Sequence, residues 1–179
     1  MAEGPRYRVH FRRRRNGKTN YRYRLKLLKS GKPRAVVRVT NQRVLVSLTS
    51  YDPKGDVVSA QAQSSELPEL GFGEHSLTAT PAAYLTGYLA GVRGLAAGQQ
   101  EAVLDGGLTH PTPGGRVMGA LKGLLDAGLQ IPHSEEHFPS ADRLSGKHLS
   151  GKPPVDLQKM IEQIKKGGTA QKKKAGRNA

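Results

Sequence analysis

Side chains that can neutralise phosphate and stack on bases follow one another along the first 34 residues of the chain. Arginines recur there, with a run of four at Arg12–Arg15, and a guanidinium can fork onto two phosphate oxygens at once, as a lysine ammonium cannot. Four rings lie among these cations, at Tyr7, Phe11, Tyr21 and Tyr23. Such rings can stack on unpaired bases, at about 1–3 kcal/mol each. The pattern therefore favours binding to RNA with exposed bases over a solvated tail or a targeting signal.

The positive charge is concentrated at the two ends of the chain. The 179 residues carry a formal net charge of +15, and residues 1–34 hold 13 Lys or Arg against one acid. Residues 35–150 hold 8 against 11, and residues 151–179 hold 8 against 2. We expect a basic RNA-binding N-terminal arm (1–34), an α/β globular domain (35–150) and a basic, partly disordered C-terminal extension (151–179). Two basic extensions on a slightly acidic body indicate that the extensions bind a polyanion.

Composition excludes several classes of function. The chain has no Cys, which rules out disulfide scaffolds, thiolate zinc sites and Cys nucleophiles. No apolar stretch follows the basic N-terminus, so we expect no secretory signal. The most apolar segment, 82–97, is interrupted by glycines and an arginine and is too short to cross a bilayer. We expect a soluble, intracellular protein with no membrane partner.

Alternation of apolar residues predicts a three-stranded antiparallel meander. The strands are expected at 35–40, 43–49 and 57–62, with a tight turn at Asn41-Gln42 and a second turn, rich in Pro and Gly, at 52–56. One face of this sheet should be buried and the other free. A helix at 80–97 and a strand at 101–105 come next. Their order implies a crossover that packs the helix on the sheet.

Further helices are expected on both sides of this unit. A short helix at 22–29 would turn Leu25 and Leu28 towards the body. Thr80-Pro81 and Thr112-Pro113 both resemble helix starts, with Thr as the N-cap and Pro at the first helical position. These and the remaining expected elements are helices at 80–97, 112–127 and 155–166, a short edge strand at 129–132 and a low-complexity tail at 167–179.

Glycines recur along the helix at 80–97, at Gly87, Gly91, Gly94 and Gly98. Each glycine inside a helix costs about 1 kcal/mol relative to Ala. The close approach of another backbone would offset that cost, so we expect helix packing here rather than a nucleotide-binding loop. Tyr84 and Tyr88, four residues apart, are expected to pack half-buried rather than to form a stacking platform.

No arrangement of side chains points to catalysis, a metal or a cofactor. Residues 113–116 at a helix start could receive an RNA phosphate, but they lack the Gly-Lys-Ser/Thr ending of a nucleotide-binding P-loop. His133–His137 is expected to be a surface loop, because its spacing fits no metal site on a helix. Asp105 and Asp126 have no obvious partner. We expect no active site, no cofactor, no metal and no small-molecule substrate.

Three polar residues of the first hairpin could extend the basic arm. Arg38, Asn41 and Arg43 lie on the presumed free face of the sheet or in its turn. Cations at sheet edges and turns also protect a sheet from aggregation, and the residues themselves do not separate the two roles. Proximity to the arm favours a continuous basic surface.

Several motifs, in order along the chain, resemble one protein family. They are Gly4-Pro5-Arg6-Tyr7, Arg12–Arg15, Lys18–Tyr21, Arg24–Arg34, Val39-Thr40-Asn41, Ala82–Gly91, Ala102–Asp105, Asp126–Leu129 and Phe138–Arg143. Together they resemble the 5S-rRNA-binding protein of the large ribosomal subunit, in its archaeal and eukaryotic branch. The short form and Leu85 resemble the archaeal members. The match runs from Gly4 to about Leu149, and the tail from Gly151 lies outside it.

The resemblance implies a ribonuclease-H-like α/β body without catalysis. It also implies a cytoplasmic place in the central protuberance of the large ribosomal subunit, between 5S rRNA and large-subunit rRNA. A second 5S-binding ribosomal protein and other central-protuberance proteins would be its neighbours. The RNA contacts that it implies are Arg6, Arg8, Arg12, Arg13, Arg14, Arg15, Lys18, Asn20, Tyr21, Arg22 and Arg24, with Arg38, Asn41 and Arg43 as secondary candidates and Lys147 and His148 behind them.

Two other functions remain as alternatives. A chromatin-like DNA-binding protein would also be basic at its ends, but it should prefer duplex DNA to 5S rRNA. An RNA-processing enzyme would need clustered carboxylates and a divalent metal, and the sequence indicates neither.

Overall fold

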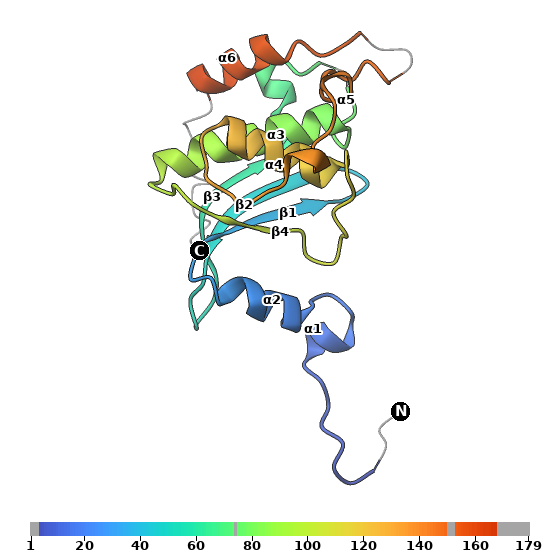
Figure 1. The fold of residues 1–179 in the computed structure, drawn as a ribbon, viewed down its shortest axis with the longest axis vertical. Coiled ribbons are helices and arrows are strands. Elements are labelled where there is room, and N and C mark those ends of the chain that lie inside the picture. Colours follow the sequence, from blue (N-terminus) through green and yellow to red (C-terminus); the bar gives the residue numbers. More distant parts are fainter. Residues whose placement is uncertain (1–3, 74, 150–152, 168–179) are drawn as a thin grey trace, which may run out of the picture.

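A four-stranded mixed sheet lies at the centre of the body (Figure 1). The computed structural model describes residues 4–73, 75–149 and 153–167. Strand order is β3-β2-β1-β4; β1 pairs antiparallel with β2 and parallel with β4. The strands are β1 (Arg34–Val39), β2 (Val44–Ser50), β3 (Val57–Gln63) and β4 (Val103–Asp105). The predicted α/β class, with a meander, a crossover helix and a further strand, is confirmed.

Helices cover the two faces of the sheet unequally. α3 (Thr80–Ala96) and α4 (Arg116–Asp126) pack on one face, and α5 (Ala141–Ser145) and α6 (Leu157–Gly167) lie beyond them (Figure 1). The other face carries α2 (Tyr21–Leu28), which follows the single turn α1 (Arg12–Arg15). The 3-10 turns are η1 (Ser64–Glu66), η2 (Pro68–Leu70) and η3 (Glu135–His137). We call the two sides the α3/α4 face and the α2 face.

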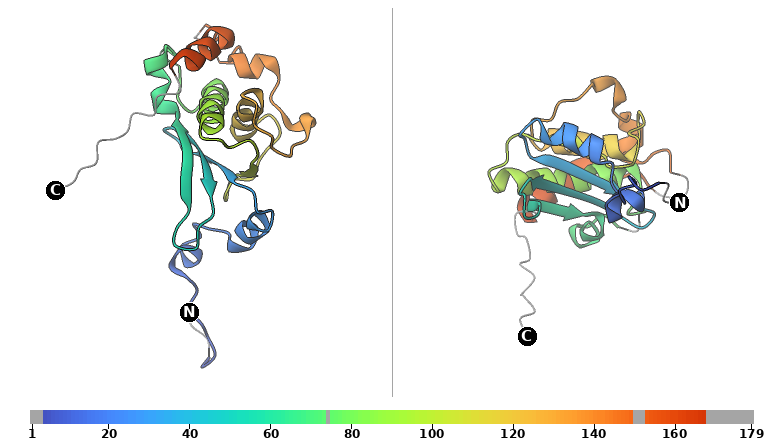
Figure 2. Two further views of the ribbon diagram at one scale, coloured as in Figure 1. Left: turned by 90° about the vertical axis from the view of Figure 1, so that its left-hand side faces the viewer. Right: turned by 90° about the horizontal axis from the view of Figure 1, so that it is seen from below.

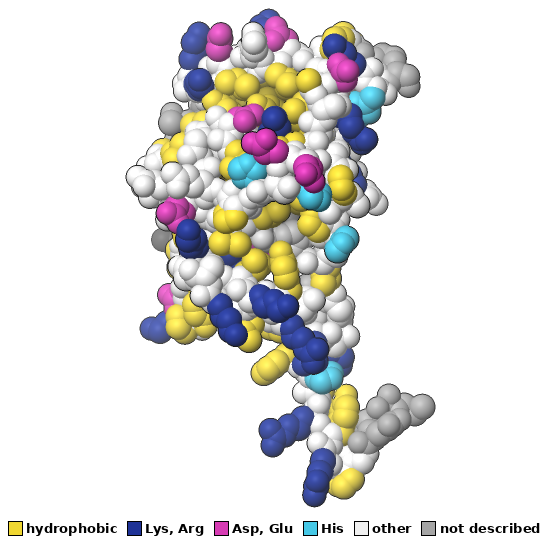
Figure 3. All heavy atoms as spheres, viewed as in Figure 1, with side chains coloured by type: hydrophobic (Ala, Val, Ile, Leu, Met, Phe, Trp, Pro, Cys, Tyr) yellow, Lys and Arg dark blue, Asp and Glu magenta, His cyan; other side chains and the backbone are white. Residues whose placement is uncertain are grey.

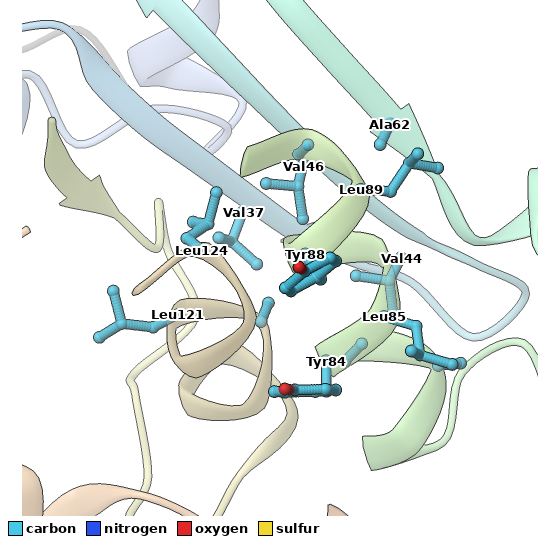
Figure 4. Close-up of a cluster of buried hydrophobic side chains, with 14 of the residues drawn as sticks. Val37, Val44, Val46, Ala62, Tyr84, Leu85, Tyr88, Leu89, Leu121 and Leu124 are labelled. Carbon is cyan, nitrogen blue, oxygen red and sulfur yellow. The ribbon is translucent and has the colours of Figure 1, made fainter. Parts of the chain in front are cut away.

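The core lies between the sheet and the α3/α4 layer (Figure 4). Alternate residues of β1 and β2 point into it, and Val37, Val44 and Val46 are at most 1% exposed. Leu85 and Leu89 of α3 belong to the same cluster of side chains and are fully buried. Removing this apolar surface from water stabilises the fold by about 25 cal/mol per Å². Because the apolar residues alternate along the strands, this burial decides which face of the sheet packs on α3 and α4.

Glycines let α3 and α4 approach backbone to backbone. A Cβ at Gly87 would overlap the carbonyl oxygen of Ala120, and one at Gly123 would overlap that of Tyr84. The expected approach of another backbone is confirmed at Gly87, whereas the nearest neighbours of Gly91 and Gly94 are the side chains of Ala127 and Leu48. The expectation was wrong at Gly98, which follows α3 and has nothing near its Cβ position. Tyr84 and Tyr88 are 5% and 4% exposed, so they are packing residues buried more deeply than expected.

Some predicted boundaries were wrong. α4 begins at Arg116 with Gly115 as its N-cap, three residues after the expected cap at Thr112. Residues 112–115 instead form a turn, in which the Gly115 N–H donates to the Thr112 carbonyl and Gly114 has a positive φ of 67°. A helix cannot pass through a left-handed residue. In α3 the cap is Ala79, not Thr80.

The C-terminal elements depart less from expectation. The predicted edge strand at 129–132 is reduced to one parallel bridge between Glu101 and Gln130. α6 matches the helix expected at 155–166, and its Met160 and Ile164 are buried in the same core cluster. The expected low-complexity tail lies outside the described residues from 168 onwards. None of the described helices is long and apolar enough to cross a bilayer.

Candidate nucleic-acid interface

Helix α2 lies across the outer face of the sheet and connects the preceding residues of the arm to the body (Figure 2). Asn20 caps it, because its side-chain oxygen accepts a hydrogen bond from the Tyr23 N–H at 3.1 Å. Leu27 is the buried residue of α2, and Tyr23, one turn earlier, donates its hydroxyl to the Leu104 carbonyl at 3.4 Å. The prediction that Leu25 faces the body was wrong, since it is 57% exposed. Tyr23 and Leu27 are four residues apart and therefore lie on the same side of α2, the side that faces the sheet.

Three arginines and two aspartates form a continuous network beneath α2. Arg24 donates from Nη2 to both carboxylate oxygens of Asp56, at 2.9 Å each. Arg34 donates to Asp56 Oδ2 at 2.5 Å and to Asp105 Oδ2 at 2.8 Å. Arg38 donates to Asp105 Oδ1 at 3.2 Å and to the Asp105 carbonyl at 2.8 Å. We call these five residues the Arg–Asp network.

The strand pattern explains how the network assembles. Arg34 and Arg38 alternate with inward residues of β1, so both point to the α2 face. The parallel register sets Asp105 of β4 opposite Val36, between the two arginines. Asp105 therefore has two cationic partners, which corrects the expectation that it had none. The side chains of Arg34 and Asp105 are 5% and 6% exposed, so each depends on the other's charge.

Charges in the network also act on Tyr23. Burial raises the pKa of the Tyr23 hydroxyl, the negative charge of Asp105 raises it further, and the positive charge of Arg38 opposes them. Tyr23 is therefore held as a neutral hydrogen-bond donor against β4, and its ring joins α2 to the sheet.

The second aspartate without an expected partner also has one. Tyr84 of α3 donates its hydroxyl to Asp126 Oδ2 of α4 at 2.8 Å. Burial, followed by this hydrogen bond, raises the pKa of Tyr84 well above its ordinary value. This contact lies within the α3/α4 layer and away from the Arg–Asp network, so it has a structural role.

A pocket of about 310 Å³ opens between α2, the arm and the outer face of the sheet. Five of the predicted RNA contacts line it: Arg13, Lys18, Asn20, Arg24 and Arg38. Arg34, Asp56 and Asp105 lie in its wall. The structure thus brings arm residues and a sheet residue, far apart in sequence, to one basic hollow.

Most arm cations are exposed and unpaired. Arg13 donates from Nε to the Thr19 hydroxyl at 2.9 Å. Within the described part of the chain, no acid pairs with the other arm cations before Arg24, which are Arg6, Arg8, Arg12, Arg14, Arg15, Lys18 and Arg22. Lys and Arg side chains gather over the arm, α1 and α2 at the lower end of the molecule (Figure 3). A polyanion can therefore meet these charges without displacing a protein partner.

The aromatic rings of the arm are divided between two environments. Tyr7 and Phe11 are 44% and 78% exposed. Phe11 lies against Tyr21 with ring centroids 6.2 Å apart. Tyr23, by contrast, is engaged with β4. Three of the four rings are thus open to stacking partners, and the fourth docks the helix.

Other predicted candidates lie apart from this hollow. Asn41 and Arg43 are exposed in the β1–β2 turn and do not line the pocket. Lys147 pairs with Asp142 at 3.0 Å, next to α5, beyond the α3/α4 layer (Figure 1). His148 is exposed in the same region.

The two loop candidates show no ligand-binding arrangement. His133 contacts the Ile131 carbonyl through Nδ1 at 2.8 Å and packs on Phe138. Across the described ranges, no three His, Cys, Asp or Glu side chains are grouped as a metal site would require. The Gly114 N–H, expected near a phosphate, donates to the His137 carbonyl.

Sequence reasoning missed Arg34, Asp56 and Asp105 as residues of the interface. A pattern was available: Arg34, Val36 and Arg38 alternate on one face of β1, and the crossover sets β4 parallel to a neighbouring strand. Asp105 at the end of β4 could then have been placed beside the arginines. The pairing of Asp56 depends on the shape of the β2–β3 hairpin and has no such pattern.

Comparison with known families gives one match that spans most of the body. A model described as "Ribosomal large subunit proteins 60S L5, and 50S L18" matches residues 5–101 and 96–134. The matched stretch includes the arm from Pro5, α2, the sheet and the α3–α4 pair.

Three similar curated proteins are each named large ribosomal subunit protein uL18. The protein of Methanospirillum hungatei is 51% identical over 154 residues, which cover 86% of this chain and 87% of the relative. That of Haloferax mediterranei is 51% identical over 150 residues, 84% and 81% of the two chains. That of Methanoregula boonei is 46% identical over 166 residues, 92% and 95% of the two chains.

Proposed function

The chain belongs to the family of ribosomal large-subunit proteins described by 60S L5 and 50S L18, and on that premise we propose that it binds 5S rRNA and attaches it to the large-subunit rRNA in the central protuberance. Family membership makes the chain a structural component of the cytoplasmic large ribosomal subunit and not an enzyme. The proposal concerns which RNA it holds and where.

One observation carries the proposal: exposed, unpaired arm cations lead directly into an ordered basic pocket on the body. Such a surface can contact a phosphate backbone along the arm and then on the outer face of the sheet. Release of condensed counterions favours its association with RNA. Exposed rings at Tyr7, Phe11 and Tyr21 suit bases that are not paired.

The proposed contacts are those predicted from the sequence. They are Arg6, Arg8, Arg12, Arg13, Arg14, Arg15, Lys18, Asn20, Tyr21, Arg22, Arg24, Arg38, Asn41 and Arg43. The arm threads between helices of 5S rRNA and large-subunit rRNA, and the body binds RNA by shape. Ordering of the arm on RNA costs part of the binding energy. A second 5S-binding ribosomal protein shares that RNA, and other proteins of the central protuberance are further partners.

Filter binding of the full chain to 5S rRNA tests the proposal. With six to ten phosphate contacts, affinity should fall by about 10³–10⁵-fold between 50 and 200 mM salt. A competition with duplex DNA of matched length separates the chromatin-like alternative, which requires DNA to win. A flat salt response, or preference for DNA, would contradict the proposal.

Removal of residues 1–19, the part of the arm before α2, tests where the affinity lies. Deleting residues 1–19 leaves Asn20 to cap α2 and keeps α2 on the sheet. This truncated chain should lose at least about 100-fold in affinity for 5S rRNA at 150 mM salt, and its circular dichroism should stay unchanged. The matched control replaces Arg12–Arg15 by four lysines. This variant keeps both the length and the charge of the arm, so it should retain more of the affinity than the truncated chain. Normal binding by the truncated chain would mean that the arm assignment is wrong.

A further inference from the structure

Two carboxylates lie in the middle of the surface proposed to bind RNA. Asp56 and Asp105 line the same pocket as Arg13, Lys18 and Arg38. A carboxylate near phosphate is repelled, so on charge alone each acid should weaken RNA binding. Their positions call for another role.

The contacts of the two acids show what they do for the cations. Arg34 is the bridge, because its two terminal nitrogens reach Asp56 at 2.5 Å and Asp105 at 2.8 Å. Its side chain is 5% exposed, which leaves it out of reach of an RNA backbone. Arg34 therefore joins the two acids, while Asp56 also accepts from Arg24 and the second oxygen of Asp105 accepts from Arg38.

Those outer arginines are held and still accessible. The side chain of Arg24 is 33% exposed and that of Arg38 is 41% exposed. Arg24 binds Asp56 through Nη2 alone. A guanidinium has five N–H donors, so Nε and Nη1 of Arg24 keep donors for a second acceptor. The carboxylate fixes the plane in which those donors point.

Asp56 also fixes where the arm leaves the body. It follows the β2–β3 turn, and its bond to Arg24 ties that hairpin to α2. Lys18 and Asn20, just before α2, line the same pocket. A shift of α2 would move these residues together.

We propose that Asp56 and Asp105 are positioning residues for RNA binding, which act by fixing the guanidinium groups of Arg24 and Arg38 and the seat of α2. The inference rests on the proposed function and deepens it. Groups ordered before binding lose less conformational entropy when the complex forms. The acids thus raise affinity for a polyanion although they carry the same sign of charge.

A pair of isosteric variants separates positioning from charge. Asp56→Asn and Asp142→Asn each remove one negative charge, and Asp142 is an exposed acid in α5, paired with Lys147. If only charge matters, both variants should bind 5S rRNA as tightly as the wild type or more tightly. If Asp56 positions Arg24, Asp56→Asn should weaken binding by about 3- to 10-fold at 150 mM salt, and Asp142→Asn should not weaken it.

A double-mutant cycle gives a second, independent readout. Arg24→Lys keeps the charge but removes the planar guanidinium whose Nε and Nη1 donors remain available to a second acceptor, so it should also weaken binding. In the Arg24→Lys background, Asp56→Asn should add less than about 2-fold, because the two residues act through one contact. Unfolding in urea, followed for each variant, checks that the binding measurements report on folded protein.

The outcomes are distinct. Binding of Asp56→Asn as tight as that of Asp142→Asn, or additive effects in the cycle, would overturn the positioning role. If Asp56→Asn does not fold, Arg24→Lys alone tests the inference, and wild-type affinity would overturn it. Absence of 5S rRNA preference in the wild type would refute the proposed function itself.

Discussion

The two faces of the sheet use opposite chemistry to hold a helix. On the α3/α4 face, apolar side chains and glycines bring helices into close contact, and every residue of α3 from Thr80 to Gly91 is buried. On the α2 face, a hydroxyl, a leucine and the Arg–Asp network hold a helix with one buried residue. The α3/α4 face stabilises the fold by burying apolar side chains. The α2 face buries few of them and keeps charged side chains accessible to a partner.

The largest expected effect tests whether the α2 face also stabilises the fold. Arg34→Met should lower the free energy of unfolding by about 3 kcal/mol, because it leaves Asp105 buried with one cation instead of two. Arg34→Lys should lose less, since it keeps the charge but not both contacts. Urea denaturation measures both changes. Wild-type stability in Arg34→Met would show that this face serves binding alone.

A second prediction concerns the close packing of the α3/α4 face. Gly87→Ala should destabilise by about 2 kcal/mol, since the new methyl group would overlap the Ala120 carbonyl oxygen. Gly55→Ala is the matched control, because a Cβ there meets nothing within 4 Å. Thermal or urea unfolding should separate the two variants. Equal stability would mean that α3 and α4 are not locked at this position.

The third prediction uses pH to test the polar contact between Tyr84 and Asp126 within the α3/α4 face. Tyr84→Phe should cost about 1 kcal/mol through loss of the hydrogen bond to Asp126. The pKa of Tyr84 is raised in the folded state, so its contribution is complete below about pH 10, the value of a free tyrosine. It is lost as pH rises further. Unfolding free energies between pH 8 and 11 should fall more steeply for the wild type than for Tyr84→Phe; parallel curves would contradict this.

The smallest effect concerns the rim of the α2 face. Arg43→Gln, in the exposed β1–β2 turn, should leave stability within about 0.5 kcal/mol of the wild type. If Arg43 contacts one phosphate, the slope of log affinity against log salt should decrease by about 1. Salt titrations of 5S rRNA binding measure this slope. An unchanged slope would assign Arg43 to protection of the sheet edge instead.

Periodicity made the α3/α4 face predictable from the sequence. Alternation in β1 and β2 located the strands and their inward residues, because burial on one face leaves a period of two. The glycines of α3 indicated close packing, since nothing else offsets their cost in a helix. The start of α4 was missed because a left-handed Gly114 broke the cap pattern. Local turn geometry of this kind overrides a cap motif.

The α2 face was less predictable. Its cations were evident as composition, and five of the predicted contacts do line one pocket. Their counter-charges were missed for two different reasons. Asp105 could have been placed from the alternation of β1 and the parallel crossover to β4, whereas the pairing of Asp56 depends on the shape of a hairpin turn, which leaves no periodic pattern in the sequence. Helix α2 itself was placed within one residue, but its inward side was rotated from Leu25 to Leu27.

The wide sequence separation within the Arg–Asp network has a consequence for folding. Arg34 and Asp105 lie 71 residues apart, and the α3 crossover lies between β1 and β4 in the chain. Loop closure over such a distance is among the slow steps of folding. A chain emerging during synthesis displays its basic arm long before the last carboxylate of the seat exists. The Arg–Asp network can therefore be complete only once β4 has joined the sheet. The α2 face takes its final form when the rest of the sheet is already in place.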